Sequence, residues 1–490
     1  MDTLIQYVEF WAEKQGNKIA LIDRNNSWSY KKLKNKISDL QRFFTEYGLK
    51  KGDTIGFSGE KSVNLVSVYI SLFGLGINVV PLPEKMNVNK KIDETLRISN
   101  CDYVIKHDYY NDEFWIDAVN DFLNCEKGKR INIRSKSNES SELIDFDEKT
   151  YFNLTSGSTG DPKIVNVKNK KLIFNAKAVN AKYPMLTSDC YTCFFSTDMH
   201  PHELFVKPLI SGAKCLLINT DELINLDNIL RKNNISHMLL TPHTLKSMLK
   251  ISKDFNSWSS IKNILIGGEF VPLSLRKSCF EKTGRLVTVA WGSTETSGIS
   301  ITLPEEIAFT DESFIGEALP GYEVKVDKET KELLIKSDSC LDSYKNFNGE
   351  NPLTTDGFYK TGDLAEISED GLIKLNGRKN SLVKVNGRKI PLNILEIKAL
   401  KIPELDEVYV MNHIDESLIT VFYSADTKYQ SKVRVLLKNL LEIHLSDVSY
   451  RIVYLEEIPK LENGKTNRDY LENFYKKREY GTELKWKQKQ

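Results

Sequence analysis

The sequence of 490 residues lacks the features that mark membrane and secreted proteins. No uninterrupted apolar run approaches the roughly 18 residues that a membrane-spanning helix requires. The first residues contain no basic segment followed by an apolar one, which argues against a secretory signal peptide. We therefore expect a cytoplasmic protein with no membrane span.

Cysteine is scarce, since seven residues, an odd number, are scattered along the chain. Such a set is typical of reduced thiols in the cytosol and does not suit a disulfide framework. Cys190 and Cys193 form a Cys-x-x-Cys pair, but neither a second pair nor a histidine follows at the spacing of a zinc site. The segment that holds them is aromatic and typical of a strand, so we predict that both pack in the core.

Net charge is also nearly absent, because 68 basic residues oppose 67 acidic ones and leave +1. This balance gives no electrostatic reason to expect a nucleic-acid partner. With 40% apolar and 28% charged residues, the composition is that of an ordinary globular protein. The length exceeds what one hydrophobic core supports, so at least two domains are expected.

Helical and strand patterns alternate along most of the chain. Apolar spacing predicts helices over residues 33–44 and 62–74, and strands at 54–57, 78–82, 103–105, 216–218, 238–240, 264–266 and 286–289. Residues 111–149 read as a charged peripheral segment, and 331–376 as short strands with turns at Asn348-Gly349, Asp356-Gly357, Asp370-Gly371 and Asn376-Gly377. The prediction is an α/β protein whose large N-terminal domain (1–378) has largely parallel sheets, crossover helices and a small β-rich subdomain. A small α+β domain (379–490) follows.

One loop has the composition of a phosphate-binding site. Its hydroxyls, glycines and lysine can surround anionic oxygens, and glycine permits the backbone conformations of a concave nest. The residues are Thr155, Ser156, Gly157, Ser158, Thr159, Gly160 and Lys163. The Walker loop requires four residues between its glycines and a helix directly afterwards, whereas residues 164–167 predict a strand. We therefore expect a loop between two strands; a plain polar turn is the alternative.

Other polar tips follow predicted strands, where ligands of open α/β sheets bind. These tips contain Thr241, Gly267, Gly268, Glu269, Trp291, Gly292, Ser293, Thr294 and Glu295. Glu295 is a candidate Mg²⁺ ligand beside a polyphosphate, and the carboxylate of Asp363 suits a ribose diol. Lys465 can oppose the charge of two reacting anions. Taken alone, Asp363 and Lys465 are more typical of surface turns.

Together these segments resemble the AMP-forming adenylating superfamily, which includes acyl- and aryl-CoA synthetases, nonribosomal peptide synthetase adenylation domains and firefly luciferase. The matching segments are 28–33, 155–163, 292–295, 359–363, 377–378, 384–387 and 463–465, and they cover nearly the whole chain in the family's order. The resemblance implies that a carboxylate attacks the α-phosphate of ATP, releases pyrophosphate, and then passes its acyl group to the thiol of CoA or of a carrier-protein phosphopantetheine.

The resemblance also implies roles for individual residues. The loop 155–163 would hold the β- and γ-phosphates, Glu295 the Mg²⁺ and Thr294 the α-phosphate. Gly267, Gly268, Glu269 and Gly292 would surround the adenine, Trp291 would stack on it, and Asp363 and Arg378 would bind the ribose. Lys465 would contact the reacting carboxylate and be withdrawn for thioester formation when the small domain rotates.

The sequence departs from the family pattern at a few positions. The aromatic residue before Gly292 is usually Tyr and is Trp291 here, and the hinge position, usually Asp or Lys, is Asn380. The chain stops about 25 residues after Lys465, so we expect a free-standing ligase that donates to CoA or a separate carrier protein. Two rivals are a non-catalytic nucleotide-binding relative and a phosphotransferase that uses the loop to move the γ-phosphate.

The acid substrate should be selected by residues 196–205, with Asp198, Met199, His200 and His202 and the tips Thr241, Gly267 and Gly292 as the predicted pocket. By resemblance, Asp198 lies close to the position where amino-acid-activating relatives bind the substrate ammonium. His200 and His202 instead resemble residues of acyl- and aryl-acid-activating relatives. The two indications conflict. We favour slightly an aryl or acyl acid over an amino acid, with pocket-lining or structural roles for both histidines in preference to metal binding.

Overall fold

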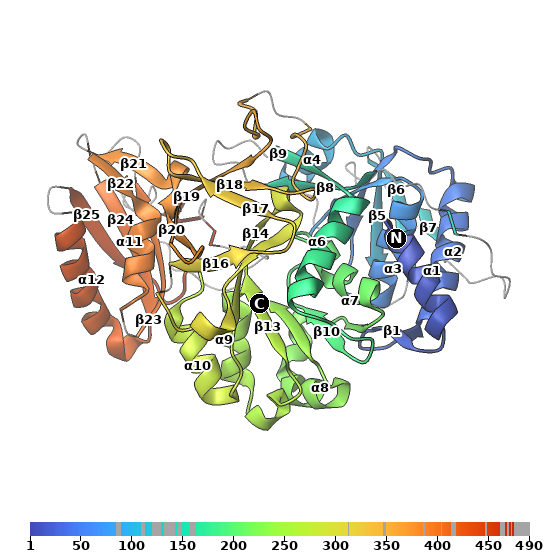
Figure 1. The fold of residues 1–490 in the computed structure, drawn as a ribbon, viewed down its shortest axis with the longest axis horizontal. Helices are drawn as coiled ribbons and strands as arrows, with labels where there is room; N and C mark the ends of the chain where they lie inside the picture. The colour runs from blue at the N-terminus through green and yellow to red at the C-terminus, as the bar shows by residue number, and fades with distance from the viewer. Residues whose placement is uncertain are drawn as a thin grey trace. The chain divides into compact units, whose positions relative to one another are not determined.

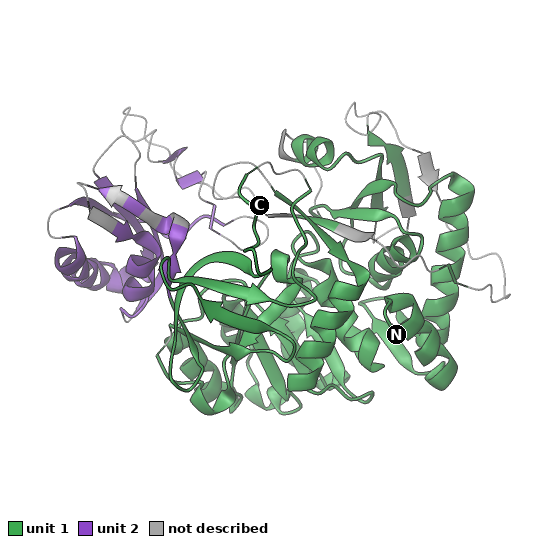
Figure 2. Ribbon diagram, turned by 45° about the horizontal axis from the view of Figure 1, so that its top comes forward, with its two compact units in different colours: residues 1–375 green, residues 376–490 purple. Residues whose placement is uncertain are grey.

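The computed structural model describes residues 1–84, 90–108, 113–119, 129–131, 143–144, 149–155, 163–311, 313–345, 349–385, 388–402, 404–412, 418–445, 448–460, 466–467, 470–471 and 473–474. Contacts within the chain divide it into two compact units, Met1–Leu375 and Asn376–Gln490 (Figure 2). Among the described residues, no helix combines the length and apolar character that crossing a membrane requires.

The first unit contains a seven-stranded sheet whose central pairings are parallel. Its order is β7 (Lys129–Ile131), β6 (Glu113–Ala118), β5 (Tyr103–Asp108), β3 (Thr54–Ser58), β4 (Asn78–Pro81), β8 (Lys149–Thr155) and β9 (Lys163–Lys168). Strands β5, β3, β4 and β8 run parallel, while the pairs at both edges are antiparallel. The predicted largely parallel sheet is therefore correct for the centre only.

The first unit also contains a second sheet, of thirteen strands, and β20 is the last of these strands in the sequence. Its order is β17 (Glu323–Val326), β18 (Glu332–Lys336), β19 (Tyr359–Ile367), β20 (Ile373–Arg378), β16 (Phe314–Ala318), β15 (Gly298–Thr302), β14 (Thr288–Ser293), β13 (Asn263–Gly267), β12 (His237–Leu240), β10 (Cys190–Cys193), β11 (Lys214–Leu216), β1 (Ile19–Ile22) and β2 (Ser27–Ser29). Strands β11, β10, β12, β13 and β14 pair in parallel. Their carboxyl ends therefore meet at one edge, which is where the predicted polar tips lie.

Helices pack against these sheets and bury their apolar faces (Figure 1). The described helices of the first unit are α1 (Leu4–Gln15), α2 (Tyr30–Tyr47), α3 (Val63–Gly74), α4 (Lys90–Ile98), α6 (Asn169–Lys182), α7 (Val206–Ser211), α8 (Leu226–Asn233), α9 (Pro242–Ile251) and α10 (Leu273–Thr283). Local sequence sets their ends: the Ser29 hydroxyl accepts from Lys32 N at the start of α2, and Gly48 ends it with a φ of +103°. Helix α3 is buried along its whole length, which fits its mostly apolar sequence.

Two parts of the chain differ from what local sequence indicated. The segment 111–149, predicted to be charged and peripheral, contributes β6 and β7 at the edge of the sheet, where β6 pairs with β5, the strand just before it in the sequence, and β7 pairs with β6. Asn376-Gly377 is not a turn, because both residues lie inside β20. By contrast, Gly357 and Gly371 have φ values of +83° and +80°, as turns at those two positions require. Asn348 lies outside the described residues.

Cys190 and Cys193 lie on β10 and are buried as free thiols. Burial raises the pKa of each thiol to about 12, so both stay protonated at neutral pH. Among the described residues, no group of three or more His, Cys, Asp or Glu side chains could hold a metal ion. The prediction of core packing for this pair is confirmed.

The second unit is an α+β arrangement with a core of its own. Its elements are η6 (Lys379–Ser381), β21 (Leu382–Val385), β22 (Arg388–Pro391), α11 (Leu392–Ala399), β23 (Leu405–Asn412), β24 (Leu418–Ala425), α12 (Gln430–His444) and β25 (Ser449–Tyr454). Strands β23, β24 and β25 form a three-stranded sheet against which α11 and α12 bury Leu395, Val433 and Leu437. This fold class, α/β followed by α+β, agrees with the prediction.

Candidate active site

The predicted phosphate loop joins two antiparallel strands. Strand β8 ends at Thr155, β9 begins at Lys163, and these two residues are register partners. The prediction of a loop between strands, which excluded the Walker arrangement, is therefore confirmed. Residues 156–162, which include Ser156, Gly157, Ser158, Thr159 and Gly160, lie outside the described residues, as does Lys465.

Lys163 and Glu295 both contact Tyr344, a residue that the sequence analysis did not predict for the site. The Tyr344 hydroxyl donates a hydrogen bond of 2.9 Å to Glu295 Oε1, and Lys163 Nζ lies 5.0 Å from the centre of the Tyr344 ring. Burial, and then the charge of Glu295, raise the pKa of Tyr344 well above its usual value, so the hydroxyl remains a donor. Tyr344 also pairs with Val165 of β9 through a β-bridge, which fixes its position beside the loop.

Glu295 lies on η4 (Thr294–Thr296), the single turn that follows β14. A reciprocal cap holds this turn, since Ser293 Oγ accepts from Thr296 N and Thr296 Oγ1 accepts from Ser293 N. The Glu295 carbonyl oxygen accepts a hydrogen bond of 2.7 Å from Leu341 N. The turn thus presents a buried carboxylate in a fixed orientation at the carboxyl end of the sheet.

The residues predicted for adenine and ribose also meet. The indole N–H of Trp291, on β14, donates a 3.2 Å hydrogen bond to Asp363 Oδ2, on β19. Asp363 is buried, and its backbone N–H donates to Thr361 Oγ1 at 3.0 Å. Arg378 is exposed and belongs to the second unit, which also contains Asn380 on η6. We call Lys163, Trp291, Glu295, Tyr344 and Asp363 the nucleotide side.

The predicted glycines allow strands and turns to approach closely. A Cβ on Gly292 would lie 2.3 Å from the Gly298 carbonyl oxygen, and one on Gly267 would lie 2.4 Å from the Ala290 carbonyl oxygen. Gly268 adopts a φ of +87° directly after β13, before Glu269. Thr241 follows β12, and its hydroxyl caps α9 by accepting from Thr244 N at 3.2 Å. The three glycines therefore contribute to the strand tips through their backbone, and the Thr241 hydroxyl caps the helix that follows it.

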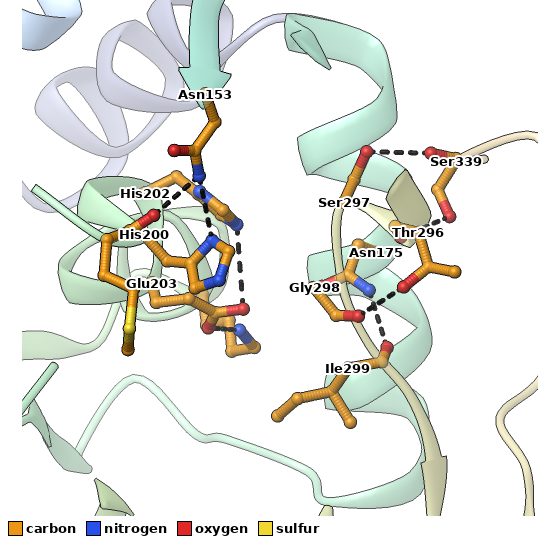
Figure 3. A network of polar contacts seen from close by, with 12 residues as sticks. Asn153, Asn175, His200, His202, Glu203, Thr296, Ser297, Gly298, Ile299 and Ser339 are labelled. Carbon is orange, nitrogen blue, oxygen red and sulfur yellow. Dashed lines mark hydrogen bonds and ion pairs between the residues drawn. The ribbon is translucent and has the colours of Figure 1, made fainter. Parts of the chain in front are cut away.

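The predicted acid-selecting segment lies against the strand that leads to the phosphate loop. Asn153, on β8, donates through Nδ2 to the Met199 carbonyl oxygen at 2.6 Å, and the same atom lies 3.2 Å from His200 Nδ1 (Figure 3). The ring centres of His200 and His202 are 5.8 Å apart in an edge-to-face arrangement. Asp198 is partly buried nearby, and its charge adds to burial in raising the pKa of Tyr69.

A buried ion pair continues this segment. Glu203, on η1 (Pro201–Leu204), pairs through Oε2 with Lys207 Nζ on α7, and His202 Nε2 lies 3.6 Å from Glu203 Oε1. Burial first, and then the Lys207 charge, lower the pKa of His202 to about 3, so the imidazole is neutral at physiological pH. We call the acid side the set Asn153, Asn175, Met199, His200, His202, Glu203, Lys207 and Gly298.

Opposite this segment, two consecutive residues with positive φ connect η4 to β15. Ser297 has a φ of +57° and Gly298 one of +126°, and hydrogen bonds hold the pair: Ser297 Oγ donates to the Ser339 carbonyl at 2.7 Å, and Thr296 Oγ1 donates to the Gly298 carbonyl at 2.8 Å (Figure 3). The sequence analysis did not single out Asn153, Asn175, Lys207 or Tyr344, and it included Glu203 only as part of the predicted segment 196–205.

Comparisons with known proteins agree with this geometry. The family model described as "AMP-binding enzyme" matches residues 8–339. The chain is 24% identical to bacitracin synthase 1 of Bacillus licheniformis over 93% of its length and to zwittermicin A synthase ZmaJ of Bacillus cereus over 96%. It spans 9% of the length of bacitracin synthase 1 and 11% of that of gramicidin S synthase 2 of Aneurinibacillus migulanus, but 95% of ZmaJ.

Solved structures show the same fold. The anthranilate CoA ligase AuaEII in complex with anthranoyl-AMP gives a TM-score of 0.79 at 18% identity, covering 96% of this chain and 97% of that one. The o-succinylbenzoate CoA synthetase MenE of Bacillus subtilis, in complex with its acyl-adenylate intermediate, gives 0.80 at 20% identity, covering 95% and 97%.

Proposed function

Because the chain belongs to the AMP-binding enzyme family, we propose that it is an ATP-dependent carboxylic acid ligase that works in two steps. A carboxylate oxygen of the substrate attacks the α-phosphorus of ATP, and the bond to the bridging oxygen of the β-phosphate breaks, which gives an acyl-adenylate and pyrophosphate. A thiolate then attacks the acyl carbon, forms a thioester and releases AMP. The thiol belongs to CoA or to the phosphopantetheine of a carrier protein.

The observation that carries this proposal is the meeting of Lys163 and Glu295 on Tyr344. A cation from the end of the phosphate loop and a buried carboxylate lie within contact of one ring, although 132 positions separate them in sequence. This arrangement suits a polyphosphate, whose charge a lysine offsets, and a metal ion bound to its oxygens. Both charged groups contact Tyr344, the lysine through the face of the ring and the glutamate through the hydroxyl.

Glu295 fits a Mg²⁺ ligand. Tyr344 takes one carboxylate oxygen, and no described group donates a hydrogen bond to the other. Mg²⁺ commonly takes one or two protein carboxylates together with phosphate oxygens and water. When bound, the ion neutralises charge that develops on the phosphate oxygens. Thr294, adjacent on η4, presents its hydroxyl to the α-phosphate in this proposal.

The remaining nucleotide contacts follow from the Trp291–Asp363 pair. Trp291 provides a flat apolar face for adenine, with Gly267, Gly268, Glu269 and Gly292 at the surrounding tips. We propose that the Asp363 carboxylate accepts hydrogen bonds from the ribose hydroxyls. We propose that Arg378 contributes from the second unit, and that Lys465 reaches the reacting carboxylate. Rotation of that unit about Asn380 remains a prediction.

Asp198 supports a second candidate substrate class, an amino acid. Its carboxylate is partly buried, and no described side chain or backbone N–H donates a hydrogen bond to it. A carboxylate in this setting is stabilised by a substrate ammonium and destabilised by an aliphatic chain. This surrounding favours the amino-acid alternative over the slight preference for an aryl or acyl acid that His200 and His202 suggested.

Carboxylate-dependent exchange of labelled pyrophosphate into ATP tests the proposal, with amino, aryl and fatty acids assayed separately. An adenylating enzyme catalyses the exchange, whereas a phosphotransferase or a non-catalytic nucleotide-binding protein does not. We expect exchange with at least one acid and its loss in Lys465→Ala. If no acid supports exchange and Lys465→Ala changes nothing, the proposed function is wrong.

A further inference from the structure

Residues 339–345 connect the two sheets of the first unit beside the nucleotide side. The segment follows β18, and at its start Ser339 Oγ donates to the Thr296 carbonyl of η4 at 3.1 Å (Figure 3). At its end, Lys345 N donates to the Ile164 carbonyl of β9 at 2.9 Å. Segment 339–345 is therefore hydrogen-bonded both to the turn that carries the candidate Mg²⁺ ligand and to the strand that begins at the phosphate-loop lysine.

This segment holds Glu295 through both its backbone and its side chain. The Glu295 carbonyl accepts from Leu341 N at 2.7 Å, and Oε1 accepts from the Tyr344 hydroxyl at 2.9 Å. Tyr359, on the same strand as Asp363, is a further hydrogen-bond partner of that hydroxyl. The segment thus contacts the three elements, β9, η4 and β19, that carry the charged groups of the nucleotide side.

A buried lysine holds the middle of the segment. Lys171, on α6, has a side chain that is only 5% exposed, and its Nζ donates to the Cys340 carbonyl and pairs with Asp342 Oδ1 at 2.9 Å. Lys168, at the end of β9, pairs with Asp342 Oδ2 at 3.0 Å. Both lysines belong to the continuous stretch 163–171, so the strand that begins at the phosphate loop and the helix that follows it both hold the segment.

Stability is a weak reason for these charged contacts. Exposed ion pairs contribute little to the free energy of folding, and the Asp342 side chain is 64% exposed. A buried ion pair is often no more stabilising than apolar side chains of similar volume, and the Lys171 ammonium is buried. Both side chains instead anchor a segment whose other hydrogen bonds go to η4 and β9, so they fix where that segment lies.

We propose that Asp342 and Lys171 are positioning residues for the proposed reaction. Through segment 339–345 they set the distance between Lys163, which offsets the charge of the phosphates, and Glu295, which holds the Mg²⁺. In this role neither residue contacts a substrate. The inference rests on the proposed function and adds a surface carboxylate outside the site to the residues on which adenylation depends.

The affinity for ATP, measured by calorimetry with Mg²⁺ and with EDTA and without any acid, tests the proposal. The ratio of the two dissociation constants measures the coupling between Mg²⁺ and ATP binding. We expect Mg²⁺ to tighten ATP binding to the wild-type protein. Asp342→Ala should reduce this ratio about tenfold, because residues that orient a metal ligand typically contribute roughly 10- to 100-fold. Pyrophosphate exchange should also fall about tenfold for every accepted acid, with the KM for the acid unchanged.

Two further variants separate positioning from folding. Asp342→Glu keeps the carboxylate and should lie closer to the wild-type protein than to Asp342→Ala in both measurements. Glu317→Ala is the matched control, because it removes another exposed partner of a lysine on α6, the 2.6 Å pair with Lys182, and it should change neither measurement. Urea denaturation should give the two alanine variants similar midpoints, since each loses an exposed ion pair.

The outcomes are distinguishable. An unchanged Mg²⁺ effect in Asp342→Ala, equal losses in Asp342→Ala and Glu317→Ala, or a urea midpoint that falls in Asp342→Ala alone overturns the positioning role while the ligase function stands. A loss of exchange confined to some acids overturns it as well. If Mg²⁺ does not tighten ATP binding to the wild-type protein, the assignment of Mg²⁺ to Glu295 is wrong, and the positioning role with it. The absence of exchange with every acid overturns the proposed function itself.

Discussion

The nucleotide side and the acid side of the candidate site hold their polar groups in different ways. On the nucleotide side, Glu295 and Asp363 each accept one hydrogen bond from an aromatic side chain, Tyr344 and Trp291. On the acid side, Glu203 is neutralised by a buried lysine, and Asn153 and Asn175 are tied to backbone carbonyls. In the proposed function, the first arrangement leaves Glu295 one carboxylate oxygen for a metal ion. In the second, Glu203 and Lys207 neutralise each other, so Asp198 is the charged group that remains to distinguish one acid from another.

This comparison leads to a general expectation. In the proposed reaction ATP takes part in every turnover, so a change on the nucleotide side should affect all acids alike. A change on the acid side should depend on the acid offered. The following predictions test whether the two sides separate in this way.

The largest effect is expected for Glu295→Gln, which keeps the shape but removes the charge. Exchange should fall by about 10² to 10³ for every acid, because stabilisation of charge on the transferring phosphates is lost. Tyr344→Phe is the matched control: it keeps the carboxylate and should cost about tenfold or less. Exchange rates across the acid panel measure both. An effect of Glu295→Gln that differs strongly between acids would contradict the assignment of Glu295 to the nucleotide side.

Gly298→Ala should affect only the acid side. Its Cβ would meet Glu203 Oε1 and Asn175 Oδ1, and a φ of +126° strains any residue with a side chain. We expect kcat/KM for the accepted acids to fall by about 10- to 100-fold, a loss of about 1–3 kcal/mol from disturbed hydrogen bonds. The KM for ATP, measured in the same assay, should remain within about twofold of the wild-type value. A parallel rise in the KM for ATP would show that the two sides are not separate.

His202 should make stability depend on pH. The unfolded imidazole takes up a proton below about pH 6.5, whereas the folded one, with its pKa lowered to about 3, does not. Unfolding is therefore favoured as the pH falls, by up to about 1.4 kcal/mol per pH unit below 6.5. Urea denaturation at pH 7.5 and pH 5 should show a smaller acid loss in His202→Gln than in the wild-type protein. Equal losses would exclude a neutral buried His202.

The smallest effect is expected for Trp291→Phe. Phenylalanine keeps an aromatic face for adenine but loses the N–H that donates to Asp363. The KM for ATP should rise by about tenfold, the value of one hydrogen bond to a charged group, with the order of preference among acids unchanged. Trp291→Ala should cost more, because stacking is lost too. If Trp291→Phe reordered the acids, Trp291 would belong to the acid side.

The sequence by itself determined the fold class. It also placed Trp291 and Glu295 at the carboxyl end of β14, whose neighbour β13 runs parallel to it. Lys163 begins an antiparallel strand of the other sheet, and only the fold brings it to Tyr344, which also contacts Glu295. The sequence did not indicate β6 and β7, because charged residues obscure their strand pattern and each depends on pairing with the strand before it, β6 with β5 and β7 with β6. Asn376 and Gly377 likewise lie in a strand and not in a turn, because β20 pairs with its neighbours in the thirteen-stranded sheet.

Only the tertiary structure decided which residues join the predicted segment 196–205 on the acid side. Asn153 and Asn175 carry no motif, and each bonds to a residue 46 or more positions away, Met199 for Asn153 and Ile299 for Asn175. Hydrogen bonds and buried charges depend on distances of a few ångströms, and these are set by the packing of β8, α6, α7 and β15. A sequence motif identifies functional residues that lie close together in the chain. In the proposed function, selection of the acid depends on side chains that only folding brings together.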